Sequence, residues 1–430
     1  MNRPGETEGT NHHGGGFSRR RLIKAGAIVA GVTTIAPAAT LAWMELPQLA
    51  LAKSAGQPEA AATASPPSVI STPPRKWGPN APPEIYPDPD IIVIDPSFGK
   101  VLIGIDAIHR VWTGGDWLEG PAWSEKGSYL VFSDVHLNKQ FKYDWNTGQV
   151  SVFRDPSQNS NGNSFDFQGR QLSTQDNFRR VIRWENDNRL TVIADNYNGK
   201  PLNSPNDLVP HPDGSIWFTD PPYGDTLSEG HPDAAGGPTN PDGLLNPALG
   251  DPEGVKIGGQ TRQLPTNTYR WDPSGALDIV ADESMVPDPN GICFSPDYKT
   301  LYIISTGKGP GDTGPGGQGI IFAFDVVGTG RGTQLQNQRV FTDMMVDGVH
   351  CGPDGMRADV YGNLYCGSNT VLGYAGVIVF DSTGKLLGRI RLPEVCANVA
   401  FGGPKRNFLF MTASQSLYRL QLQTQGAAPG

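Results

Sequence analysis

Basic residues are scarce in this chain and are rarely clustered. The 430 residues include 34 Lys and Arg against 43 Asp and Glu, which gives a formal net charge of −9. A surface that binds nucleic-acid phosphates needs clustered Lys and Arg. The one basic cluster is residues 19–21 with Lys24. The composition therefore argues against a nucleic-acid partner.

Cysteine is also scarce, with four residues in a chain far too long to need them as staples. An exported protein can still form a disulfide, and Cys351 and Cys396 each lie just before a repeated polar motif described below. They are the best candidate pair. Free buried thiols are the favoured interpretation for all four cysteines.

Charged residues make up only 18% of the chain, whereas glycine and proline are abundant at 54 and 38 residues. Aromatic residues account for 9%. This composition is typical of many short strands joined by tight turns and is unlike that of long helices. It predicts an all-β protein.

The N-terminal 90 residues differ from the rest. Residues 18–24 read Ser-Arg-Arg-Arg-Leu-Ile-Lys and precede an apolar run over residues 25–41, which is the order of a twin-arginine export signal. We expect such a signal over residues 1–52, export to the periplasm or medium through the twin-arginine machinery, and no membrane span in the mature chain. The alternative is an N-terminal membrane anchor. Residues 53–90 are rich in Ala, Ser and Pro and predict a linker, so the N-terminal signal and linker should be disordered or extended.

A short motif recurs along the rest of the chain, and its clearest copy is residues 289–297, Pro-Asn-Gly-Ile-Cys-Phe-Ser-Pro-Asp. Each copy has a polar residue at the head of a predicted strand and often a following glycine. The six head residues are Glu119, Asn161, Asn206, Asn290, Asp354 and Asn398. Three of the five intervals between them fall in the low forties, which is the length of a four-stranded propeller blade. A six-bladed β-propeller over residues 91–425 is the predicted fold.

Two intervals are longer because they hold Gly- and Pro-rich insertions, at residues 221–265 and 307–318. Loops of this length are often functional lids, with disorder as the alternative. The last unit lacks outer strands, and residues 91–95 and 107–112 are expected to complete it. The rival fold is a β-sandwich with a separate small domain, but a sandwich gives no reason for a polar head every forty-odd residues.

In a propeller the six heads would surround one mouth of the central channel. Two carboxylates among carboxamides form a set of oxygen donors, which suits a hard divalent cation, Ca²⁺ best and Mg²⁺, Mn²⁺ or Zn²⁺ as substitutes. A single Asn or Asp before glycine more often only makes a turn. That plain interpretation is kept for Asn161 and Asn398.

The motifs resemble those of the gluconolactonase and regucalcin (senescence-marker protein) family. The matching stretches are residues 118–123, 202–207, 217–224, 289–291 and 353–356. The resemblance covers roughly residues 111–420. It implies a six-bladed propeller with one divalent cation at the channel mouth and hydrolysis of a sugar lactone, such as glucono-1,5-lactone, to the hydroxy acid.

Residue by residue, the resemblance makes Glu119, Asn290 and Asp354 metal ligands and Asp354 also the general base. Asn206 matches an asparagine that contacts substrate or completes the metal shell. The chain departs from the family at Ser204, where regucalcin-type members have arginine, and at residues 173–177, which lack a histidine found in many bacterial members. These departures put the identity of the lactone in question.

Two further residues are expected to contact substrate, Tyr223 before the first insertion and His350 near Asp354. A loop histidine bonded to backbone is the plain alternative for His350. A metal-bound hydroxide competes with Asp354 for activation of water. The alternatives for the whole protein are a paraoxonase-like or strictosidine-synthase-like activity on a bulkier ester or lactone, and a non-catalytic propeller whose cation plugs the channel.

Overall fold

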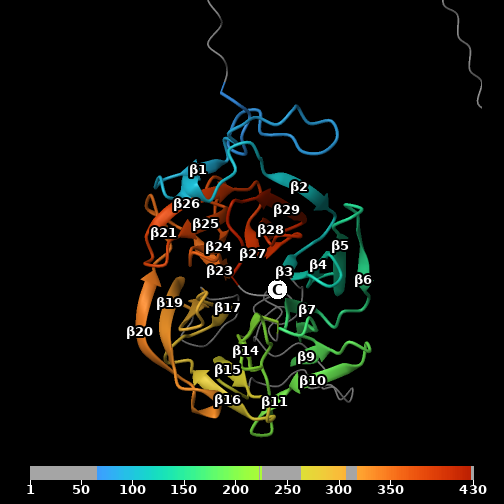
Figure 1. The fold of residues 1–430 in the computed structure, drawn as a ribbon, viewed down its shortest axis with the longest axis vertical. Helices are drawn as coiled ribbons and strands as arrows, with labels where there is room; N and C mark the ends of the chain where they lie inside the picture. Colours follow the sequence, from blue (N-terminus) through green and yellow to red (C-terminus); the bar gives the residue numbers. More distant parts are fainter. Residues whose placement is uncertain (1–64, 222, 225–262, 307–316, 428–430) are drawn as a thin grey trace, which may run out of the picture. The chain divides into compact units, whose positions relative to one another are not determined.

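Short strands joined by tight turns make up the protein in a computed structural model (Figure 1). The structure describes residues 65–221, 223–224, 263–306 and 317–427. Within these ranges the helical elements are two 3-10 turns, η1 (Phe98–Lys100) and η2 (Gly330–Gly332). No helix in the described part is long and apolar enough to cross a membrane. The expected export signal over residues 1–52 lies outside the described residues.

Six antiparallel sheets, each with at least four strands, form the six blades of a β-propeller, which confirms the predicted fold. The blades are: blade 1, β3 (Leu118–Ser124), β4 (Tyr129–Asp134), β5 (Lys139–Asp144) and β6 (Val150–Arg154); blade 2, β7 (Ser160–Phe165), β8 (Gln171–Gln175), β9 (Arg180–Trp184) and β10 (Leu190–Ala194); blade 3, β13 (Leu208–Pro210), β14 (Ile216–Asp220), β15 (Asn267–Trp271) and β16 (Leu277–Ala281); blade 4, β17 (Pro289–Phe294), β18 (Thr300–Ser305), β19 (Ile320–Val327) and β20 (Gln334–Thr342); blade 5, β23 (Gly352–Ala358), β24 (Leu364–Asn369), β25 (Gly376–Phe380) and β26 (Leu386–Arg391); and blade 6, β27 (Cys396–Gly402), β28 (Phe408–Ala413), β29 (Ser416–Gln421) and β2 (His109–Thr113). Two small hairpins, β11–β12 (Asn196–Tyr197, Lys200–Pro201) and β21–β22 (Met345–Val346, Val349–His350), lie between blades in sequence.

The ring closes differently from the prediction at one strand. β2 pairs with β29 and completes blade 6, as expected. β1 (Ile91–Val93) was also expected in blade 6, but it pairs with β26 and forms a fifth, outermost strand of blade 5. The N-terminal segment therefore ties the last two blades together. Their outer edges gain the hydrogen bonds that an open edge would lack.

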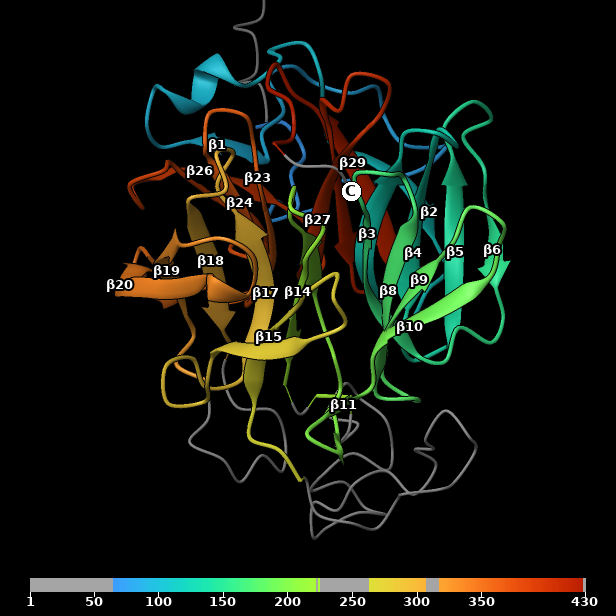
Figure 2. The same ribbon diagram turned by 60° about the horizontal axis from the view of Figure 1, so that its bottom comes forward.

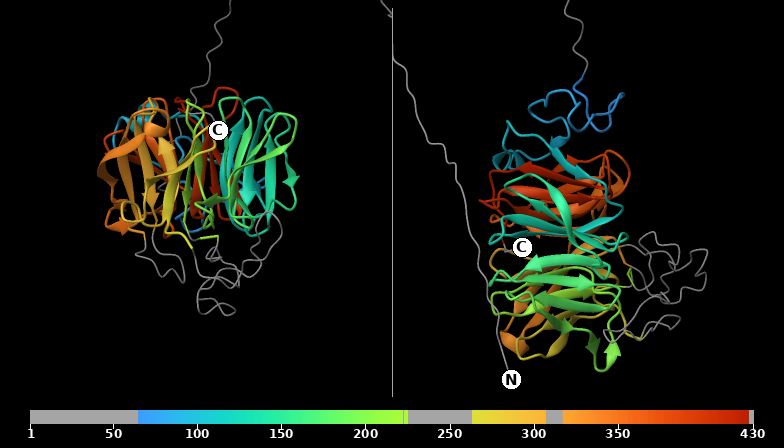
Figure 3. Two further views of the ribbon diagram at one scale, coloured as in Figure 1. Left: turned by 90° about the horizontal axis from the view of Figure 1, so that it is seen from below. Right: turned by 90° about the vertical axis from the view of Figure 1, so that its right-hand side faces the viewer.

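The first strand of each blade lies innermost, and Figure 1 shows β3, β7, β17, β23 and β27 around a common centre. Figure 2, turned by 60°, shows β17 beside β14 and β27 beside β3, and the views in Figure 3 show the blades packed face against face. Buried side chains fill the space between blades. Trp123 stacks on Phe410 of blade 6, and Trp217 of blade 3 meets Phe294 of blade 4 edge-on. Both tryptophans therefore pack between blades.

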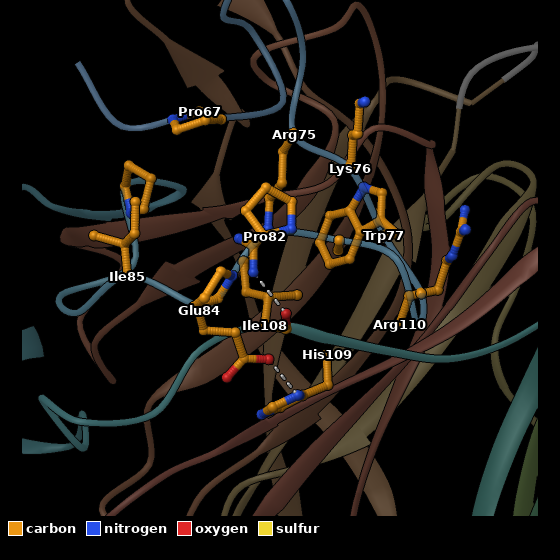
Figure 4. A pocket seen from close by; sticks show the side chains of 14 residues that line it. Pro67, Arg75, Lys76, Trp77, Pro82, Glu84, Ile85, Ile108, His109 and Arg110 are labelled. Atoms are coloured by element: carbon orange, nitrogen blue, oxygen red, sulfur yellow. Dashed lines mark hydrogen bonds and ion pairs between the residues drawn. The ribbon is translucent and has the colours of Figure 1, made fainter. Parts of the chain in front are cut away.

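Residues 65–90, which the sequence assigns to the linker, make defined contacts with the propeller. Arg75 donates to both carboxylate oxygens of Asp88 at 2.8 and 2.7 Å, and to the carbonyl oxygen of Ile108 at 2.9 Å. Trp77 lies edge-on to Tyr418 of blade 6. Figure 4 shows the hollow that this segment forms against β2, with Arg75 and Trp77 on one side and His109 on the other. None of the residues predicted for the functional site lines it.

All four cysteines are free and buried, as the favoured interpretation held, and no disulfide joins Cys351 to Cys396. Most of the two predicted insertions, residues 225–262 and 307–316, lie outside the described residues. Their proposed role as lids therefore stays a prediction.

Candidate active site at one channel mouth

The head residues lie where the innermost strands depart from regular pairing. The register with the second strand shifts between Glu119 and Ala122 in blade 1, between Pro289 and Ile292 in blade 4, and between Pro353 and Met356 in blade 5. A bulge of this kind bends a strand and redirects its side chains. The bulges at Glu119, Asn290 and Asp354 therefore turn these side chains away from the regular positions of the sheet.

Glycines next to the heads allow neighbouring innermost strands to approach closely around the ring. A Cβ on Gly120 would lie 2.1 Å from the carbonyl oxygen of Asn161, and a Cβ on Gly291 would lie 2.3 Å from that of Asp354. Side chains at these positions would collide with the backbone of the next blade. The repeated glycine thus packs each head against its neighbour and brings the polar heads to one mouth.

Asp354 is held from both sides by amides. Asn290 Nδ2 donates to Asp354 Oδ1 at 2.9 Å, and Asn369 Nδ2 donates to Asp354 Oδ2. The pKa of Asp354 is raised to about 7, mainly by burial and in small part by the charge of Asp207, against the opposing effect of the two amide hydrogen bonds. A buried carboxylate with a raised pKa at a channel mouth is a candidate functional group.

Glu119 is the second carboxylate of this mouth and is 3% exposed. Its Oε2 accepts a hydrogen bond from the Gly120 N–H at 3.0 Å. Burial raises the pKa of the Cys396 thiol well above its usual value, and the charges of Asp354 and Glu119 add to the effect. Both carboxylates are thus close enough to act on one thiol in blade 6. Sequence positions 235 residues apart are brought together by the ring.

Asn206 precedes β13 in a loop fixed by the end of β14. Its N–H donates to the Thr219 carbonyl oxygen at 2.9 Å, and its own carbonyl oxygen accepts from Gly162 N–H and Thr174 Oγ1, each at 2.8 Å. Asp220 anchors the same loop by accepting from the N–H groups of residues 203 and 204 at 2.8 Å. The side-chain amide of Asn206 hydrogen-bonds to no described residue. It remains available at the mouth.

The two predicted substrate contacts differ in how they are held. Tyr223 is buried, and its hydroxyl donates to the carbonyl oxygen of Asp288 at 3.4 Å, two residues before Asn290. The ring of His350 is bonded through Nε2 to the carbonyl oxygen of Gly319 at 2.7 Å. This backbone contact matches the plain alternative considered for His350. Its substrate role stays a prediction, as does that of Tyr223.

The remaining heads, Asn161 and Asn398, are almost fully buried. The Asn398 side-chain oxygen accepts from the Val399 N–H at 2.8 Å, which is a local turn contact. A Cβ on Gly355 would lie 2.1 Å from the Asn398 side chain. Asn398 therefore packs against the glycine that follows Asp354 and is part of the wall of the site.

Asn369 is a site residue that the sequence reasoning missed. It ends β24, the second strand of blade 5, and pairs in register with Gly352. Antiparallel pairing places the end of each second strand at the mouth where the first strand begins. A polar residue at the end of a predicted second strand was therefore the available signal.

Asp207 and Arg357 were also missed, and they form a buried ion pair behind the heads. Arg357 donates from Nη1 to Asp207 Oδ2 at 3.0 Å and from Nη2 to Asp207 Oδ1 at 3.1 Å, joining blades 3 and 5. Asp207 is fully buried and also accepts the Leu208 N–H at 2.8 Å. The pair fixes the backbone next to Asn206 and Asp354.

The donors of this mouth fit a hard cation. Among the described residues no group of three or more His, Cys, Asp or Glu could hold a metal, so any shell must combine the two carboxylates with amides. The Asn369 side-chain oxygen is buried and has no hydrogen-bond partner in the described part of the chain. A buried acceptor without a donor is costly, and water, a cation or a donor from a ligand can satisfy it. The donor set is therefore compatible with the predicted ion.

Comparison with known proteins identifies the family of this chain. The family described as "SMP-30/Gluconolactonase/LRE-like region" matches residues 117–415, and the chain belongs to this family. A gluconolactonase from Zymomonas mobilis is 29% identical over 353 residues, covering 78% of this chain and 87% of that protein. The solved structure of a gluconolactonase from Xanthomonas campestris is 30% identical, has a TM-score of 0.61, and covers 80% of this chain and 99% of that one. A calcium-binding regucalcin from Agrobacterium tumefaciens shares the fold at 18% identity and a TM-score of 0.53, over 75% of this chain and 97% of its own.

Proposed function

We propose that this protein hydrolyses a sugar lactone, an aldonolactone such as glucono-1,5-lactone, to the open hydroxy acid. The observation that carries the proposal is the buried Asp354 carboxylate, held by Asn290 and Asn369 at the mouth where Glu119 and Asn206 also lie. The gluconolactonases of Zymomonas and Xanthomonas support the same reaction class. The enzyme is thus a lactone hydrolase.

A divalent cation is part of the proposal, with Ca²⁺ the best match to the oxygen donors. Glu119, Asn206, Asn290 and Asp354 would hold it, and the calcium-binding regucalcin is a relative in fold. When bound, such an ion supplies Lewis-acid polarisation of a carbonyl oxygen. Mg²⁺, Mn²⁺ and Zn²⁺ are the substitutes to be tested.

Asp354 is the proposed general base that takes the proton of the attacking water. Its two amide partners fix both carboxylate oxygens, so the orientation is set before substrate arrives. Asn206, whose side-chain amide bonds to no described residue, is proposed to hydrogen-bond a substrate hydroxyl. Tyr223 and His350 are proposed as outer substrate contacts on either side of the Asn290 and Asp354 loops.

The direct test is a pH-stat screen of aldonolactones, aromatic lactones and phosphotriesters, run before and after exhaustive chelation. We expect turnover of an aldonolactone that is lost on chelation and restored by Ca²⁺ or Mn²⁺. Indifference to the chelator would refute the cation. Turnover confined to aromatic lactones or phosphotriesters would favour the paraoxonase-like alternative, and no turnover at all would favour a binding propeller.

Export is a separate proposal that rests on the N-terminal sequence. The twin-arginine pattern in residues 18–24 would direct the folded protein to the periplasm or the medium. Replacing Arg19, Arg20 and Arg21 with lysine should retain the protein in the cytoplasm. Cell fractionation in a host with and without a twin-arginine translocase checks this, and periplasmic protein in the host that lacks the translocase would contradict it.

A further inference from the structure

The channel mouth opposite the candidate active site holds a second pocket, which we call the far-mouth pocket. Its volume is about 530 Å³, and an adjoining cavity of about 420 Å³ shares Trp123, Glu125 and Arg406 with it. The turns after the innermost strands of blades 1, 2, 4 and 6 supply its walls. Its lining includes Glu125, Lys126, Phe167, Tyr298, Arg406 and Ala427.

Arg406 is the more buried of the two cations that line this pocket, and its charge is poorly compensated. Its side chain is 22% exposed, and its ion-pair partner among the described residues is Glu125, with Nε and Oε1 3.5 Å apart. Glu125 is 63% exposed, so this pair contributes little. Burial lowers the pKa of Arg406, which shows that the charge is partly desolvated. A planar guanidinium in such a position favours a carboxylate that binds it through two parallel hydrogen bonds.

The backbone around Arg406 is fixed by the end of the chain, so the guanidinium is presented from a defined turn. The Arg406 N–H donates to the Gly403 carbonyl oxygen at 2.8 Å, and the Arg406 carbonyl oxygen accepts from the Gly426 N–H at 2.9 Å. Gln425 Nε2 donates to the Lys405 carbonyl oxygen at 2.8 Å. The last described residues thus brace the turn that carries the cation.

Aromatic side chains form the other walls. Phe167 is 44% exposed and lies 6.2 Å from Tyr298, centroid to centroid. The Tyr298 hydroxyl hydrogen-bonds to no described residue, and the charge of Arg406 lowers the pKa of this phenol against the rise caused by burial. An exposed aromatic ring beside a second ring offers a flat apolar surface to a ligand. An available hydroxyl near the guanidinium adds a donor for an anion.

We propose that the far-mouth pocket binds a small organic carboxylate with a planar apolar body, which pairs with Arg406 and packs against Phe167 and Tyr298. Lys126 adds a positive charge at the rim, and Glu125 turns away or is displaced when the ligand pairs with Arg406. The site is separate from the lactone mouth, and its test requires no lactone. The proposal of a carboxylate site can therefore be tested and refuted independently of the proposed hydrolysis.

Calorimetric titration with benzoate as the probe, against benzamide as its neutral counterpart, tests the proposal. We expect benzoate to bind and benzamide to bind at least about tenfold more weakly, because only benzoate carries the charge that Arg406 selects. Arg406→Met should weaken benzoate binding at least about tenfold, whereas Lys299→Met, which removes a charge beside Tyr298 that does not line the pocket, should change it by less than about twofold.

Phe167→Ser supplies a second variant, since an exposed side chain can be removed without disturbing the core. It should weaken benzoate binding while the melting temperature stays unchanged. Equal affinity for benzoate and benzamide, or full benzoate affinity in both Arg406→Met and Phe167→Ser, would overturn the proposal. The proposal would also be overturned if benzoate did not bind at concentrations up to about 10 mM. This holds even if gluconate binds in its place.

Discussion

The two mouths of the channel are made by opposite ends of the same innermost strands, and they differ in chemistry. At one mouth the strands begin with Glu119, Asn290 and Asp354, at bulges that turn these side chains out of the sheet. At the other the strands end in turns that carry Arg406 and exposed Phe167. One mouth offers oxygen donors and the other a cation with aromatic walls, so a single scaffold presents two ligand chemistries.

The difference shows which parts of a repeated unit are free to vary. The glycines beside the heads must stay small because the next blade approaches within contact distance. The head residue itself can be Glu, Asn or Asp, since its side chain leaves the sheet at a bulge. The turns at the far mouth are nearly equal in length, with four residues in blade 1 and five in each other blade, but they differ in composition between blades.

The largest effect is expected from removing the carboxylates of the first mouth. Asp354→Asn and Glu119→Gln should each reduce lactone hydrolysis by about 10³-fold or more, because the proposed base and cation ligands are lost. The melting temperature should change little, since both substitutions keep the side-chain shape. Steady-state kinetics with Asp381→Asn, a half-buried carboxylate in the turn between β25 and β26 of the same blade, serves as the control. Wild-type turnover in either site variant would rule out this mouth as the active site.

A smaller effect, on stability, is expected from the Asp207–Arg357 pair that lies between the two mouths. Arg357→Met leaves the fully buried Asp207 carboxylate without its bidentate partner, which should cost about 3–5 kcal/mol of unfolding free energy. Denaturant unfolding measures this cost. The double variant Arg357→Met/Asp207→Asn removes the unpaired charge and should recover part of the loss. A double variant no more stable than Arg357→Met would show that the charge is not the cause.

The sequence predicted the fold because six polar heads recur at blade-length intervals, and the ring then determines which heads meet. Glu119 and Asp354 could be paired in advance on this basis. β1 could not be placed, because its short apolar sequence suits the outer edge of blade 5 as well as that of blade 6. Which edge it joins depends on contacts made by residues 65–90, such as Arg391 Nη2 donating to the Pro89 carbonyl oxygen at 2.7 Å.

The site was predicted less completely than the fold because the motif covers only the first strand of each blade. Asn369 comes from a second strand, and its role depends on antiparallel register with Gly352, which no spacing rule along the chain reveals. Arg357 and Asp207 are 150 residues apart. Their pairing depends on two strands facing each other across the channel wall, so a sequence without a known fold gives little sign of it.

A lesser loss of stability should follow from adding one methyl group between blades 4 and 5. In Gly291→Ala the new Cβ would lie 2.3 Å from the Asp354 carbonyl oxygen, so one strand must shift, at a cost of about 1–3 kcal/mol. The shift should also reduce lactone turnover, because Asn290 and Asp354 separate. Gly104→Ala is the matched control, since its Cβ would meet nothing within 4 Å. Equal melting temperatures for the two variants would contradict the close approach.

The smallest expected effect on the protein comes from removing the end of the chain, which lies between the channel and the far-mouth pocket. The Ala427 N–H donates to the Ala358 carbonyl oxygen at 3.0 Å, and Ala427 lies beside buried Cys293 in the lining of a small cavity. Removing residues 423–430 takes few apolar groups out of the core, and it should open Cys293 to solvent. Labelling with a thiol reagent under native conditions should then rise for Cys293 while Cys366 and Cys396 remain protected, and Cys293→Ala in the shortened chain should abolish the increase. Unchanged labelling would show that the strands themselves, and not the chain end, close this side of the channel.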